Sequence, residues 1–134
     1  MKKAFTMVEL IFVIVILGIL AMVALPRLAG SKKDAEITRA KAEIAALRSA
    51  IQTYRGANLL RQKPGSGYPE KLDEKTIAEI TNGTKLGSNW TVNDGGDTLT
   101  LTIGSETTAF KYDKAKGSLT CSGDSSTLCG KIEK

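Results

Sequence analysis

The sequence predicts an α+β protein in which one long N-terminal helix packs on a small antiparallel β-sheet. Three patterns support this prediction. An apolar run from Phe5 to Leu25 contains 21 residues and a single charged side chain. Residues 37–54 repeat apolar side chains at helical spacing, and residues 98–103 alternate apolar with polar side chains. Because a helix stripe and a sheet face both need burial, the simplest fold packs one against the other.

The chain length and composition favour a structural protein over an enzyme. The 134 residues have room for one membrane-inserted helix and one small domain. The chain carries 19 basic and 14 acidic residues, a net charge of +5, and no histidine. Histidine is the commonest general base and metal ligand. No nucleophile–base pair, phosphate-binding loop or metal cluster is visible, so we expect neither enzyme activity nor a cofactor.

The apolar run from Phe5 to Leu25 is long enough to cross a bilayer as a helix, which takes about 20 residues. Lys2 and Lys3 precede it and favour a cytoplasmic N-terminus, which places the rest of the chain outside the cytoplasm. Glu9 lies inside the run, where a charge costs on the order of 2.5–3.5 kcal/mol. That cost predicts a function for Glu9. A cleavable signal peptide is the alternative, but the run is too long for a typical signal h-region.

The segment Lys2–Ile11, with the sequence KKAFTMVELI, resembles the cleavage and methylation segment of type IV pilins and type II secretion pseudopilins. In that family a short basic leader ends in a small residue, phenylalanine usually starts the mature chain, and a glutamate follows four residues later. Phe5 and Glu9 match these positions. The resemblance implies cleavage between Ala4 and Phe5 by a prepilin peptidase, and N-methylation of Phe5. The leader ends in Ala4 where glycine is the rule, and alanine is small enough that we still expect cleavage.

The resemblance also implies a function, that of a structural subunit of a type IV pilus or a type II secretion pseudopilus. Such a subunit is anchored in the bacterial inner membrane with its domain in the periplasm, and an assembly platform in that membrane draws it into a helical filament. Cleavage would give Phe5 a cationic amine, and Glu9 of an incoming subunit would meet the amine of a neighbour. A pair within one chain is the alternative, because positions four apart share a helix face. Expected partners are further copies, the peptidase and methyltransferase, the platform and membrane lipid.

Two other functions stay open from the sequence. One is a minor or DNA-binding pilin for DNA uptake, which would need a clustered basic patch with aromatic side chains. Lys111, Lys114 and Lys116 are the candidates beyond the helix, and the overall charge is well short of a nucleic-acid-binding composition, so we do not expect nucleic acid as a partner. The other is a plain single-span membrane-anchored protein.

The helix is expected to continue past the apolar run to Arg55, with Gly56 as its C-cap. An apolar stripe predicts this continuation, and its members are Ile37, Ala40, Ile44, Leu47, Ile51 and Tyr54. Pro26 removes one helix hydrogen bond, so we expect a kink there and a softer segment up to Gly30. Many members of the resembling family also have a proline at this place. The alternatives are a helix that ends at Leu25 and, for the stripe, a coiled-coil seam.

The predicted organisation has four parts: a leader at 1–4, a transmembrane and filament-core helix at 5–25, an amphipathic helix at 26–56, and a globular domain at 57–134. Within that domain, residues 57–72 contain prolines and glycines that predict a loop. Asp73 is expected to cap a short helix over Glu74–Ile80. Three strands are expected to form an antiparallel meander, at Asn89–Val92, Thr98–Ile103 and Ala109–Asp113.

Residues 114–134 are expected to form a polar tail with a cysteine loop. Cys121 and Cys129 are close in sequence, and outside the cytoplasm such a pair predicts a disulfide. Two free buried thiols are the alternative. A bridge over this short loop would add roughly 2.5 kcal/mol to stability in the chain-entropy model.

The turn between the first two expected strands carries oxygen-bearing side chains at Asn93, Asp94 and Asp97, which are the kind that calcium takes as ligands. Their spacing does not match an EF-hand loop. Asn-Asp-Gly-Gly is also an ordinary hairpin turn. We therefore predict a turn here rather than a metal site.

Overall fold

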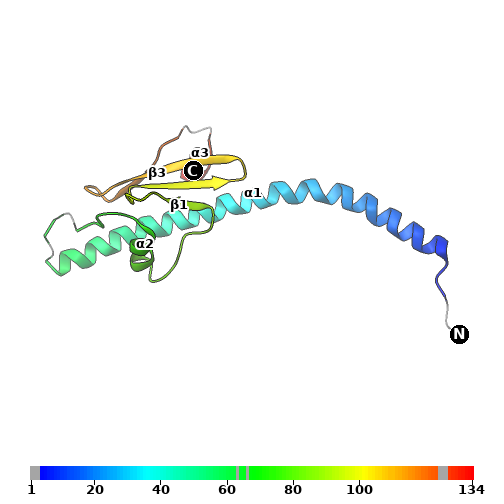
Figure 1. Ribbon diagram of the computed structural model, residues 1–134, viewed down its shortest axis with the longest axis horizontal. Coiled ribbons are helices and arrows are strands. Elements are labelled where there is room, and N and C mark those ends of the chain that lie inside the picture. Colours follow the sequence, from blue (N-terminus) through cyan, green and yellow to red (C-terminus); the bar gives the residue numbers. More distant parts are fainter. Residues whose placement is uncertain (1–3, 63, 66, 124–126) are drawn as a thin grey trace. The chain divides into compact units, whose positions relative to one another are not determined.

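The computed structural model describes residues 4–62, 64–65, 67–123 and 127–134 and has the predicted α+β architecture (Figure 1). The elements follow in the order α1 (Met7–Leu60), α2 (Glu74–Ile80), β1 (Trp90–Val92), β2 (Thr98–Ile103), β3 (Glu106–Asp113), β4 (Ser118–Cys121) and α3 (Leu128–Glu133). The chain divides into two compact units, Met1–Ala35 and Glu36–Lys134, and α1 contributes to both.

The long helix α1 continues through Pro26, which confirms the prediction that it extends beyond the apolar run. The kink at Pro26 stays a prediction. The expected end of the helix at Arg55 is wrong, because α1 runs to Leu60 and Gly56 lies inside it. Gly56 does not have the positive φ of a C-cap glycine, so the helix continues through it.

The last turn of α1 has its own local causes. Alanine and leucine, which occupy three of the four positions of Ala57–Leu60, favour helix. The buried Asn58 side-chain amide donates a 3.0 Å hydrogen bond to the Gly67 carbonyl, which ties this turn to the following loop. The backbone leaves the helix at Gln62, whose φ of 54° is left-handed, as is common just after a helix end.

Four antiparallel strands form the sheet in the order β1-β2-β3-β4, one strand more than the sequence predicts. β3 begins at Glu106 rather than Ala109, because only two residues separate the paired positions Ile103 and Glu106. Gly104, with φ 61°, supplies the left-handed residue of this short turn. β4 pairs with β3 from Asp113↔Ser118 to Phe110↔Cys121.

The core of the second unit lies between α1 and one face of the sheet (Figure 1), as the patterning predicts. Four stripe residues of α1 are almost fully buried, namely Ala40, Ile44, Leu47 and Ile51. The sheet covers them with Trp90, Leu99, Leu101, Ile103, Phe110, Tyr112 and Leu119. Trp90 also donates a 2.6 Å hydrogen bond from Nε1 to the Glu43 carboxylate, which fixes β1 to the helix.

The short helix α2 confirms the prediction for Glu74–Ile80 and its cap. The Asp73 carboxylate accepts a 2.8 Å hydrogen bond from the Thr76 amide and forms a 2.6 Å ion pair with Lys71. The bonds from Lys71 and Thr76 favour the ionised form and hold the pKa of Asp73 far below its usual range. Ile77 points from α2 into the core.

The expectation of a polar tail at 114–134 is wrong, because the chain here forms β4 and α3. Leu119, Leu128 and Ile132, the three residues able to anchor this segment, are all buried. Leu128 and Ile132 are four apart, so one face of α3 meets the core. A helix of six residues is not stable alone, and these tertiary contacts explain why local sequence does not predict it.

Candidate functional site

The site that the sequence singles out lies at the start of α1. Ala4, Phe5 and Thr6 precede the helix and are exposed, and Met7 is its first residue. The Ala4–Phe5 bond therefore lies in non-helical chain just before the first turn. A protease needs access to the peptide backbone, and a bond in that conformation offers it because no helix hydrogen bond has to break there.

Glu9 lies in the first turn of α1, and Thr6 is its partner in a reciprocal cap. The Thr6 amide and hydroxyl each donate a 3.3 Å hydrogen bond to Glu9 Oε2. In return, the Glu9 amide donates a 3.3 Å hydrogen bond to Thr6 Oγ1. This is a capping box, in which a Thr at the N-cap and a Glu three residues later satisfy each other's free donors. Glu9 therefore has a structural partner within its own chain.

The sequence interpretation did not include Thr6, although the spacing Thr-x-x-Glu carries the signal for a capping box. The three hydrogen bonds of the cap join only four groups, namely the backbone amides of Thr6 and Glu9, the Thr6 hydroxyl and Glu9 Oε2. Within the described residues Oε1 of the same carboxylate takes no hydrogen bond. One carboxylate oxygen thus serves the helix end, and the second is available to a cation outside it.

Beyond its first turn, α1 presents a continuous apolar surface as far as Leu25. Its large side chains from Met7 to Leu25 are exposed along α1, including Phe12, which is 66% exposed, and Met22, which is 79% exposed. An 18-residue window of this helix has a mean hydropathy of 3.0, and by length and composition the helix can cross a membrane. A signal sequence would have the same property.

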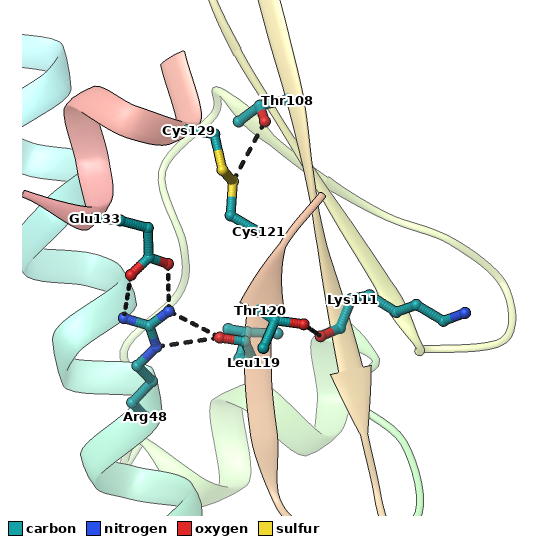
Figure 2. A network of polar contacts seen from close by, with 8 residues as sticks. All are labelled: Arg48, Thr108, Lys111, Leu119, Thr120, Cys121, Cys129 and Glu133. Carbon is teal, nitrogen blue, oxygen red and sulfur yellow. Dashed lines mark hydrogen bonds and ion pairs between the residues drawn. A yellow bond between two sulfur atoms is a disulfide. The ribbon is translucent and has the colours of Figure 1, made fainter. Parts of the chain in front are cut away.

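The predicted disulfide between Cys121 and Cys129 is present and joins the end of β4 to α3 (Figure 2). Beside it, Arg48 of α1 reaches both elements. Its guanidinium donates hydrogen bonds of 2.8 and 3.3 Å to the Leu119 carbonyl and lies 2.5 Å from the Glu133 carboxylate. Figure 2 shows this guanidinium between the helix α3 and the strand β4. A covalent bond and an ion pair thus hold the C-terminal segment on the domain.

The turn considered for calcium uses its polar side chains on itself. Asn93 Oδ1 accepts from the amides of Asp97 and Thr98 at 3.1 and 3.0 Å, and Asn93 Nδ2 donates to Asp97 Oδ1 at 2.5 Å. The bond from Asn93 lowers the pKa of Asp97. Among the described residues no group of three His, Cys, Asp or Glu side chains is placed to hold a metal ion.

A long helix with an exposed apolar half, packed by its other half on a small antiparallel sheet, defines an α+β protein whose N-terminal helix can cross a membrane by length and composition. A family model described as the prokaryotic N-terminal methylation motif matches residues 1–25. No solved structure gives a significant match.

Relatives of two kinds share longer stretches. The chain is 33% identical over 105 residues to the type IV narrow pilus major component PilA5 of Thermus thermophilus, a match that covers 78% of this chain and 83% of that one. It is 39% identical over 79 residues to the type II secretion system core protein G of Escherichia coli, covering 59% and 54%. The same protein of Aeromonas hydrophila is 43% identical over 77 residues, covering 58% and 54%.

The chain belongs to the family of type IV pilins and type II secretion pseudopilins. Its matches span about half the length of the secretion-system proteins and most of the length of the narrow-pilus component. A structural role as a pilin or pseudopilin follows from this membership and from the fold.

Proposed function

We propose that this chain is a non-enzymatic filament subunit that is cleaved between Ala4 and Phe5 by a prepilin peptidase and methylated on Phe5. The apolar segment 5–25, which is helical from Met7 onward, anchors it in the bacterial inner membrane and later forms the filament core. The remaining domain lies in the periplasm. The observation that carries this proposal is the N-terminal geometry, since an exposed, non-helical Ala4–Phe5 bond directly precedes a helix turn that contains the single charge of the apolar run.

In this proposal, cleavage creates the partner of Glu9. The new α-amine of Phe5 is cationic, and methylation leaves it charged. Opposite charges attract strongly where the dielectric constant is low, and an unpaired charge there is costly, so pairing is favoured. The capping box is compatible with a pair between copies, because Thr6 of the same chain uses Glu9 Oε2 and leaves Oε1 for the amine of a neighbour.

The N-terminus of the mature chain gives the first test. Mass spectrometry of the protein isolated from membranes should show a chain that starts with N-methylated Phe5. Conversion of Ala4 to glycine should give the same mature mass, with faster processing if alanine is the poorer substrate. An intact N-terminus that retains Met1, in a cell with an active prepilin peptidase, would contradict the proposal.

The role of Glu9 needs a variant that separates charge from helix capping. Glu9→Gln keeps the side chain that a capping box accepts and removes the negative charge. Glu9→Ala removes both. We expect both variants to insert into the membrane and both to lose filaments. Normal filaments from Glu9→Gln, with loss only in Glu9→Ala, would assign Glu9 to the cap rather than to pairing with an amine.

A further inference from the structure

The last turn of α1 presents two exposed leucines, Leu59 and Leu60, which together form an apolar knob. Outside the run from Phe5 to Leu25, Leu59 and Leu60 are the exposed large apolar side chains of the described chain, at 52% and 88% exposed. They are adjacent in sequence at the end of α1. The buried apolar residues of the same helix, by contrast, face the core. Neither leucine belongs to the core of the single chain or packs against it.

A groove lies elsewhere on the same unit. It measures about 550 Å³ and runs between α1 and the segment that follows α2. Its apolar surface comes from Ala42, Ala46, Leu47 and Ala50 on the helix and from Ile80 and Leu86 on the opposite side. The small alanines leave the space that the groove occupies, and a bulky apolar group would fill it.

The charges at the groove fit the end of a helix. The carboxyl end of a helix carries a partial negative charge from its free carbonyls, and cations stabilise it. The last turn of α1 contains no basic residue. Lys85 lines the groove, is exposed, and makes no ion pair within the described residues. Arg39 lines it too, with its guanidinium 2.9 Å from the Glu43 carboxylate.

We propose that the last turn of α1 from one copy, with Leu59 and Leu60, docks in the groove of a second copy, where Lys85 faces its free carbonyls. This inference rests on the proposed filament function and names one contact within it. The knob cannot enter the groove of its own chain, because 14 residues of rigid helix place Leu60 about 21 Å from Ala46. Knob and groove are different surfaces, so the contact is head-to-tail, and such a contact builds an open helical array when it does not close into a ring.

Paired cysteines test this contact in cells that carry the assembly machinery. Ala46→Cys and Leu60→Cys are placed together in the full chain. A disulfide needs Cα atoms about 4.4–6.8 Å apart, so a 46–60 bond can form only between copies. The control pairs Leu60→Cys with Gln52→Cys, an exposed position of α1 outside the groove. Mild oxidation of sheared filaments should give a ladder of covalent multimers for the first pair and monomers for the control.

A charge substitution gives a second readout. Leu60→Lys should lower the yield of filaments about tenfold or more, because it would bury an ammonium group in an apolar groove beside the like charge of Lys85. Gln52→Lys should leave the yield unchanged. Filaments of the cysteine variant that show no 46–60 bond, or full yield from Leu60→Lys, overturn the contact and leave the filament function standing. Absence of filaments from the unmodified chain overturns the proposed function itself.

Discussion

Gly117 lies directly against the aromatic ring of Tyr68, so that a Cβ on Gly117 would overlap the ring carbons Cδ1 and Cε1. Gly117 is in the turn between β3 and β4, with a φ of 63°. The same ring also meets α1, where the Arg55 guanidinium lies 4.7 Å from the ring centroid and donates a 2.8 Å hydrogen bond to the Tyr68 hydroxyl. One aromatic ring thus joins the long helix to the sheet.

Gly117→Ala should destabilise the domain by roughly 2–3 kcal/mol, because it combines a strained left-handed alanine with overpacking against the Tyr68 ring. Gly104→Ala is the matched control. Gly104 has nearly the same φ, 61°, but a Cβ there meets nothing within 4 Å. We expect about 1 kcal/mol for the control, in which the strained backbone acts alone. Chemical unfolding of the two full-length variants in detergent measures both values, and equal losses would show that the ring contact contributes nothing.

Whether an element of this fold can be predicted from the sequence depends on how many neighbouring residues carry its pattern. The stripe at Ile44, Leu47 and Ile51 repeats over several turns, and β2 alternates over six residues, so both elements are predictable. β4 and α3 are four and six residues long. Their stability comes from pairing with β3, from the disulfide and from core contacts, all of which join residues far apart in the chain.

Asp73 should make the stability of the domain depend on pH in the acid range. Its folded-state pKa is depressed well below that of the unfolded chain, which is about 3.9. The ionised cap therefore contributes its full stability above the unfolded value, and that contribution falls as the pH drops through and below it. Asp73→Asn can still cap α2 but does not titrate.

Unfolding midpoints of wild type and Asp73→Asn, measured between pH 7 and pH 2, check this prediction. The wild-type midpoint should fall more steeply below about pH 4 than that of the variant. Parallel curves for the two proteins would mean that Asp73 does not contribute to acid sensitivity. Asp94 offers a control carboxylate, because it is exposed in a turn, and Asp94→Asn should leave the acid limb unchanged.

Arg48 and Glu133 should be coupled by about 0.5–1 kcal/mol. The pair is two-pronged and its side chains are about two-fifths exposed, at 39% and 38%, so solvent screens part of the attraction. A double-mutant cycle with Arg48→Met and Glu133→Gln isolates the pair from the Arg48 bond to the Leu119 carbonyl. The pair Lys114–Glu70 is the comparison, since its side chains are 65% and 84% exposed, and its coupling should be near zero. A coupling that does not fall with added salt would contradict the ionic origin.

At the candidate site, the sequence identifies Glu9 because it is the single charge in an apolar run. The contacts of its carboxylate cannot be read from that pattern. The capping box with Thr6 depends on where the helix begins. That boundary is among the least certain features of sequence-based prediction. The contacts of Arg48 could not be predicted either, because its partner Glu133 is 85 residues away on an element without a local signal.

Reduction of the Cys121–Cys129 disulfide should lower the free energy of unfolding by roughly 2.5 kcal/mol, the value expected from loop closure over an eight-residue separation. The loss has a structural consequence as well, because α3 then depends on the Arg48–Glu133 and Lys131–Glu106 ion pairs and on the burial of its own apolar residues. Limited proteolysis should therefore cut the reduced chain after Lys131 sooner than the oxidised chain. The Cys121→Ser, Cys129→Ser double variant is the control, and its stability should match the reduced wild type and not respond to reductant. If reductant lowers the stability of that variant too, the effect does not arise from this bond.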